Sequence, residues 1–257
     1  MELLRELCCG WERRDGRVTE MLKNLGDIIH AYGNEFKNTL IGTDENQKKL
    51  YGFFVSRKLL EAAYASLLLR FDPVRFLILR NYQMNTGYSH SDRHMASIDW
   101  SKDFVPAEKV QIEKEVSSKD FVRALLGGHL GDSIWSQSIS AIDKKYSTAQ
   151  CPQFITDIIS PWYDNNSDLK KTDVILNIYR QESQSIFSSL SKGVHLEFIV
   201  KEDTKLDPVT IDETMTKAIT LIMKVSFILS FSDTILHPIE SSHVERIYSQ
   251  LIEDLSL

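Results

Sequence analysis

The stretch QKKLYGFFVSRKLLEAAYASLLLRFDPVRFLILRNYQ, residues 47–83, decides the fold that we expect of this chain. The apolar residues that recur there at helical intervals are Leu50, Phe53, Phe54, Leu60, Ala63, Leu67 and Leu68. This spacing predicts a long helix with one wide apolar face. Asp72 and Pro73 then predict the start of a second helix, because aspartate caps a helix and proline suits its first turn. The second helix is apolar nearly all round and is predicted to be buried.

Helical spacing continues along the rest of the chain. The ranges predicted as helices are 2–9, 18–32 with an end at Gly33 and a kinked extension over 36–41, 106–116, 121–126, 134–142, a short helix stopped at Pro161, 174–194, a last long helix from Thr210 or Asp212 broken by Pro238, and 241–255. The segment HLEFIV, 195–200, could form a strand, but no second strand pairs with it. Alternating strands with turn signals are missing. The sequence therefore predicts an all-α bundle of about eight to ten helices, mostly in antiparallel pairs.

The domain organisation has two interpretations. The chain of 257 residues is long enough for one helical domain over 1–257, or for two sub-bundles over 1–105 and 106–257. The polar segment at 84–105 is predicted to be a loop and is one place where such a boundary would fall.

Composition and charge exclude several classes of protein. The hydrophobic content of 42% excludes general disorder, and the net charge of −6 argues against a protein dedicated to coating DNA. Cys8, Cys9 and Cys151 lack the spacing of a zinc site, so we expect reduced thiols and a cytoplasmic protein. The chain contains no window long enough to span a membrane and no signature of a cofactor site.

Positive charge is concentrated in the central stretch. The basic residues from 48 to 80 are Lys48, Lys49, Arg57, Lys58, Arg70, Arg75 and Arg80, against Glu61 and Asp72. One hypothesis is a local strip that binds RNA or DNA through Arg57, Arg70, Arg75 and Arg80. The alternative, which the acidic balance of the whole chain favours, is that these arginines pair with carboxylates elsewhere and lay their stems along the core.

Arg123 and His129, in the segment RALLGGH, are the candidate catalytic residues. Their spacing resembles the active-site motif of the HEPN ribonucleases, small helical domains that often act in toxin–antitoxin and antiviral systems. The resemblance implies a metal-independent ribonuclease whose active site is completed across a homodimer. In that mechanism a neutral imidazole at position 129 activates a 2′-hydroxyl and the guanidinium of Arg123 holds the phosphate.

Two other histidine-containing segments are weaker candidates. His90 and His94 lie within ten residues of Asp92 and Asp99, a combination that could bind a divalent metal. The spacing matches no known zinc motif, so we predict no metal site there. His195 follows the predicted helix stop at Gly193, where a capping or core position is the simpler interpretation.

These observations favour a non-catalytic helical subunit that binds a protein partner or nucleic acid within a multicomponent assembly. The HEPN resemblance suggests prokaryotic antiviral defence as the setting of that assembly. The alternative function is the dimeric HEPN-like ribonuclease itself.

The alternative predicts a specific effect of one substitution. His129→Ala is expected to lower RNA cleavage by a factor of about 100 or more, because it removes the general base. Single-stranded RNA incubated with each protein in chelator measures this, with His195→Ala as the control. Equal cleavage by the wild type and His129→Ala would exclude the ribonuclease, and so would a mass in solution of a single chain.

Overall fold

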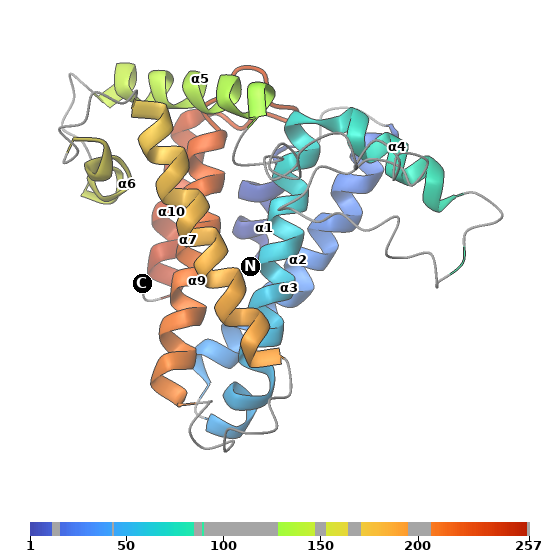
Figure 1. Ribbon diagram of the computed structural model, residues 1–257, viewed down its shortest axis with the longest axis vertical. Helices are drawn as coiled ribbons and strands as arrows, with labels where there is room; N and C mark the ends of the chain where they lie inside the picture. The colour runs from blue at the N-terminus through green and yellow to red at the C-terminus, as the bar shows by residue number, and fades with distance from the viewer. Residues whose placement is uncertain are drawn as a thin grey trace, which may run out of the picture.

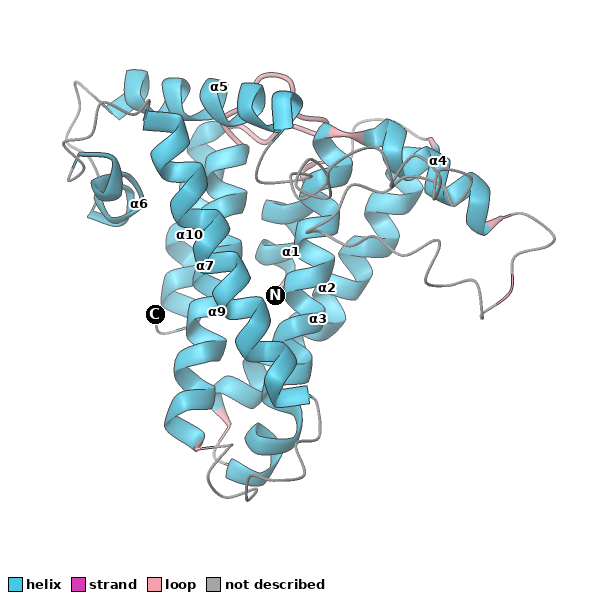
Figure 2. Cartoon of the chain, in the orientation of Figure 1, coloured by secondary structure: helices cyan, strands magenta, loops and turns pink. Residues whose placement is uncertain are grey.

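The computed structural model describes residues 1–11, 16–42, 44–84, 89, 128–146, 153–163, 171–194 and 207–255. Within these ranges every regular element is a helix and no strand occurs (Figure 2). The helices are α1 (Glu2–Cys9), α2 (Arg17–Ile41), α3 (Glu45–Phe71), α4 (Pro73–Gln83), α5 (Gly128–Tyr146), α6 (Gln153–Tyr163), α7 (Lys171–Val194), α9 (Pro208–Leu229) and α10 (Ser241–Leu255). The predicted all-α class is confirmed.

Both ends of α3 are set by residues next to them in the sequence. The Asp44 carboxylate caps the first turn and accepts hydrogen bonds from the backbone N–H groups of Asn46, at 2.9 Å, and Gln47, at 3.1 Å. The helix runs without a break to Phe71. Asp72 then accepts a hydrogen bond from the backbone N–H of Arg75, and α4 begins at Pro73. The predicted break and restart are confirmed.

Helix α3 is the centre of the fold and packs against α1, α2, α4, α7 and α9. Its C-terminal half is buried on all sides rather than along one face. Large side chains of α3 with no exposed surface include Leu59, Leu60, Tyr64, Leu67 and Leu69. Leu50 and Phe54, which the spacing assigns to the apolar face, are instead exposed on the outer surface at the start of α3.

The prediction that Gly33 ends a helix is wrong, because α2 continues through it to Ile41. The glycines of α2 allow α1 to approach closely. A Cβ atom added at Gly26 would lie 2.8 Å from Nε of Arg5, and one added at Gly33 would lie 2.9 Å from Cβ of Met1. These two residues therefore serve helix–helix packing rather than helix termination.

Helix α4 is less buried than predicted. Phe76 and Leu79 face the core, whereas Val74 is 63% exposed. Helix α4 packs on α2 and α3 and projects away from the upright helices (Figure 1). One face of this short helix therefore meets solvent although its sequence is apolar nearly all round.

Helix α9 is buried along most of its length, as its sequence predicts. It begins earlier than predicted, at Pro208, where Asp207 accepts a hydrogen bond from the backbone N–H of Thr210 at 3.2 Å. It also ends earlier, at Leu229, so that Pro238 lies in the connection to α10 rather than at the helix end. No helix within the described ranges is both long and apolar enough to cross a membrane.

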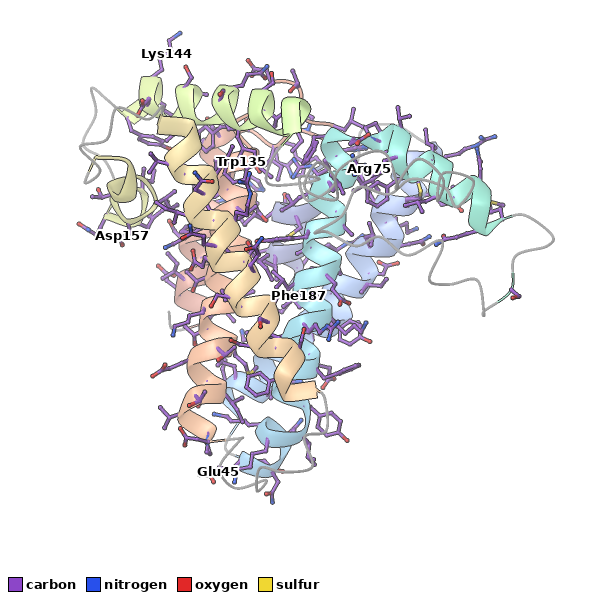
Figure 3. All side chains as sticks on the ribbon, viewed as in Figure 1. Glu45, Arg75, Trp135, Lys144, Asp157 and Phe187 are labelled. Atoms are coloured by element: carbon purple, nitrogen blue, oxygen red, sulfur yellow. The ribbon has the colours of Figure 1, made fainter. Side chains whose placement is uncertain are left out.

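Helix α5 lies across one end of the upright helices (Figure 1). Figure 3 shows Trp135 pointing from α5 toward the bundle and Lys144 pointing away. The Trp135 side chain is completely buried, and its ring centroid is 5.9 Å from that of Tyr179 on α7. Helix α6 continues to Tyr163, two residues beyond the stop predicted at Pro161.

Several predicted elements lie outside the described residues. They are the loop at 84–105 apart from Met84 and Ser89, the helices predicted over 106–116 and 121–126, and the candidate strand over 195–200. The division into one domain or two sub-bundles stays a prediction.

Gly10 generates a prediction for stability. Its φ of +73° and ψ of −173° belong to a region that only glycine adopts readily, and an added Cβ atom would lie 1.9 Å from the carbonyl oxygen of His237. Gly10→Ala is therefore expected to lower the free energy of unfolding by about 3 kcal/mol, measured by urea denaturation. Gly16→Ala is the control, because a Cβ atom there meets nothing within 4 Å. Equal stabilities of the two variants would contradict the close approach.

Candidate functional site

The four arginines of the predicted basic strip occupy two kinds of environment. Arg57, Arg75 and Arg80 lie at least partly in solvent, whereas Arg70 has no exposed surface. Because Arg70 is enclosed, the prediction that it contacts a phosphate from this strip is incompatible with the structure. The nucleic-acid hypothesis for the other three arginines stays a prediction.

Arg70 binds backbone carbonyl groups from two distant segments. Its Nη1 donates to the carbonyls of Leu7 and Cys8, each at 3.2 Å. Its Nε donates to Leu236 at 3.0 Å, and its Nη2 donates to His237 at 3.1 Å. The first two carbonyls belong to the last turn of α1, whose carbonyls lack partners inside the helix and attract positive charge.

The burial of Arg70 affects ionisation in its surroundings. Burial lowers the pKa of Arg70 to about 10, so the side chain stays charged at neutral pH. Burial raises the pKa of the Cys8 thiol to about 12 and also raises the pKa of Cys9. Both cysteines are free and buried. Their thiols are therefore unreactive neighbours of the arginine rather than nucleophiles.

Each remaining arginine of the strip is held by a carboxylate. Nε of Arg57 lies 3.1 Å from Oε1 of Glu61, and its guanidinium lies 4.8 Å from the centre of the Phe187 ring. The other two ion pairs are Arg75 with Asp72, at 2.8 Å, and Arg80 with Glu20, at 3.1 Å. These contacts agree with the alternative interpretation that the arginines pair with carboxylates, but only Glu20 comes from elsewhere in the chain, because Glu61 and Asp72 lie within one turn of their arginines. The pairs offset part of the positive charge that a phosphate would need.

Most of the other predicted site residues lie outside the part of the chain that the structure describes. Arg123, His195 and the candidate metal loop from His90 to Asp99 lie outside the described residues. His129 lies in the first turn of α5. No group of three or more potential metal ligands occurs in the described part of the chain. The pairing of Arg123 with His129 stays a prediction.

The outer surface at the start of α3 carries a cluster of exposed apolar side chains. Leu50 is 66% exposed, Tyr51 is 53% exposed and Phe54 is 39% exposed. Residues three and four apart are neighbours on a helix surface, so these three side chains adjoin. Phe54 also meets Tyr32 of α2 edge to face, with ring centroids 6.2 Å apart. We call Leu50, Tyr51 and Phe54 the α3 apolar patch; it lies toward the end of the molecule marked by Glu45 in Figure 3.

A second group of polar residues gathers where α1 meets α10 and was not identified from the sequence. The Glu6 carboxylate accepts hydrogen bonds from Nε1 of Trp11 and from Nε2 of His243, the latter at 2.7 Å. His237 lies nearby, bonded to the carbonyl of Trp11. The residues come from opposite ends of the chain, so no local spacing could reveal them.

No protein-family model, curated protein or solved structure matches this chain. The resemblance to HEPN ribonucleases therefore rests on the spacing of Arg123 and His129 and on the helical class.

Arg70 generates a prediction that stability and thiol chemistry both test. Arg70→Lys keeps the charge but provides fewer donors, so the free energy of unfolding is expected to fall by about 2–4 kcal/mol. Cys8 and Cys9 are then expected to react with iodoacetamide in the native protein, as measured by peptide mass spectrometry. Arg80→Lys is the control, because its exposed ion pair with Glu20 contributes at most about 1 kcal/mol. A stable Arg70→Lys variant with protected thiols would show that the carbonyl contacts are dispensable.

Proposed function

We propose that this protein is a non-catalytic helical subunit that binds a protein partner through the α3 apolar patch, within a multicomponent assembly. The observation that supports this proposal is the exposure of Leu50, Tyr51 and Phe54 side by side on one helix. Single exposed apolar residues are common on protein surfaces, but adjoining large ones mark interaction sites. Two of the three are aromatic, the type enriched where binding energy is concentrated in interfaces.

The surroundings of the patch favour a protein over nucleic acid as the partner. The nearest arginine of the strip, Arg57, is engaged by Glu61 and by the Phe187 ring. The chain as a whole has a net charge of −6, which opposes the phosphate backbone of nucleic acids. An apolar surface beside compensated charges fits the apolar core and polar rim of a protein interface.

The position of the patch on α3 also supports this role. Directly beside the patch, Gly52 packs so closely on α9 that an added Cβ atom would lie 2.8 Å from Cγ2 of Ile211. Lys48 of α3 forms an ion pair with Asp212 of α9 at 2.9 Å. The helix is therefore fixed before any partner arrives, which reduces the loss of conformational entropy on binding.

Leu50→Asp tests this proposal. Tagged protein purified from the native host is expected to retain a stoichiometric partner, and Leu50→Asp to reduce the retained amount about tenfold or more, because it places a charge in an apolar interface. Quantitative mass spectrometry identifies the partner, and titration with that partner in purified form confirms direct binding. Val74→Asp is the matched control, since Val74 is 63% exposed on α4.

Two outcomes would overturn the proposal or change the partner. Equal retention of the partner by Leu50→Asp and Val74→Asp would remove the α3 apolar patch as the interface. A mass in solution twice the 29.6 kDa of the chain, reduced to one chain by Leu50→Asp, would show that the patch binds a second copy instead.

A further inference from the structure

A cavity of about 250 Å³ lies between α1, the first turns of α2 and the connection from α9 to α10. Its lining includes Arg5, Trp11, Leu22, Lys23 and His237. The volume is slightly below the range of roughly 300–1,000 Å³ for sites that take drug-sized ligands, so an occupant would be small. The cavity is remote from the α3 apolar patch and is independent of the proposed function.

His237 has an unusual backbone conformation. Its φ of +52° is the only positive φ of a non-glycine residue among the described residues. A left-handed conformation destabilises an ordinary residue by about 1–2 kcal/mol, and such residues cluster at functional sites. The hydrogen bond from Arg70 to the His237 carbonyl, at 3.1 Å, and the close approach of Gly10 hold the conformation in place.

The imidazole of His237 has one nitrogen engaged and one available. Nδ1 lies 2.7 Å from the carbonyl oxygen of Trp11. A carbonyl only accepts hydrogen bonds, so Nδ1 carries the proton and donates it. Nε2 has no partner within the described part of the chain, and His237 lines the cavity. The ring is thus fixed in orientation while Nε2 remains free to bind a ligand.

Some charged groups that line the cavity have protein partners and others do not. The Glu2 carboxylate accepts a hydrogen bond from Nη1 of Arg5 at 3.0 Å. Glu6 accepts hydrogen bonds from Trp11 and His243 (described above), so both carboxylates of the lining are occupied. The ammonium group of Lys23 forms no ion pair or hydrogen bond with any described residue. Among the described residues, the lining groups without a protein partner are therefore the solvent-exposed ammonium of Lys23 and Nε2 of His237. When the imidazole is protonated both groups are hydrogen-bond donors, and their complement is then an anion.

We propose that this cavity binds a small organic anion whose carboxylate or phosphate group is held by Lys23 and His237. The apolar part of the ligand packs against Trp11 and Leu22, which supply the apolar surface of the lining. A protonated imidazole donates from both nitrogens, so His237 can keep its bond to Trp11 and donate to the anion at the same time. The strained backbone of His237 is then what sets the ring at the cavity wall.

Isothermal titration calorimetry with benzoate and with phenyl phosphate tests the proposal and distinguishes the two anionic groups. At least one of them is expected to bind in a 1:1 ratio, while benzyl alcohol, which has the ring without the charge, is not. Lys23→Gln and His237→Gly are each expected to weaken binding about tenfold or more. Glycine adopts a positive φ readily, so His237→Gly removes the ring without disturbing the fold. Lys217→Gln changes the net charge equally on exposed α9 surface and is expected to leave the affinity unchanged.

Three results would overturn the proposal. The first is the absence of saturable binding for both anions up to about 10 mM, well above the concentrations at which specific sites fill. The second is binding that Lys217→Gln weakens as much as Lys23→Gln does. The third is equal affinity for benzyl alcohol and the anions, which would show an apolar cavity without an anion site.

Discussion

The guanidinium of Arg70 lies inside the protein and donates hydrogen bonds to the backbone carbonyls of Leu7, Cys8, Leu236 and His237. Burying a charge is unfavourable unless hydrogen bonds replace its water. The planar fork of arginine provides enough donors to do this for carbonyls from two segments. Reciprocally, the backbone N–H of Leu236 donates to the carbonyl of Arg70 at 2.8 Å. The end of α1, the end of α3 and the connection before α10 therefore become a single junction.

That junction explains two local features that would be unfavourable elsewhere. Gly10 passes so close to the carbonyl of His237 that no other residue fits, and His237 itself has a left-handed backbone. The bonds from Arg70 stabilise the segment that carries this strain. The cavity beside the junction thus has walls fixed by core contacts, and a fixed imidazole is better suited to selective binding than a mobile one.

The features that the sequence could predict are those that depend on local spacing. The all-α class, the Asp44 cap of α3 and the restart at Pro73 each follow from residues within one or two turns. Gly33 shows the limit, because its role depends on Met1, which precedes α1, and sequence spacing does not reveal which segment lies opposite. The prediction for Arg70 is wrong for the same reason, because its partners are more than 60 positions away in both directions. Its position among basic residues in the sequence suggested a surface strip instead. The cavity residues likewise come from both ends of the chain and carry no common motif.

The α3 apolar patch and the Arg70 junction lie at opposite ends of one unbroken helix, about 30 Å apart along its axis. Coupling between two sites requires an element with two alternative arrangements. Helix α3 is continuous and contains no proline between them, and its buried side chains fill a close-packed core, which resists continuous deformation. Binding at one end of α3 is therefore not expected to change the structure at its other end. The two proposed binding sites are therefore independent of each other, and a partner at the patch and an anion in the cavity are expected to bind without affecting each other's affinity.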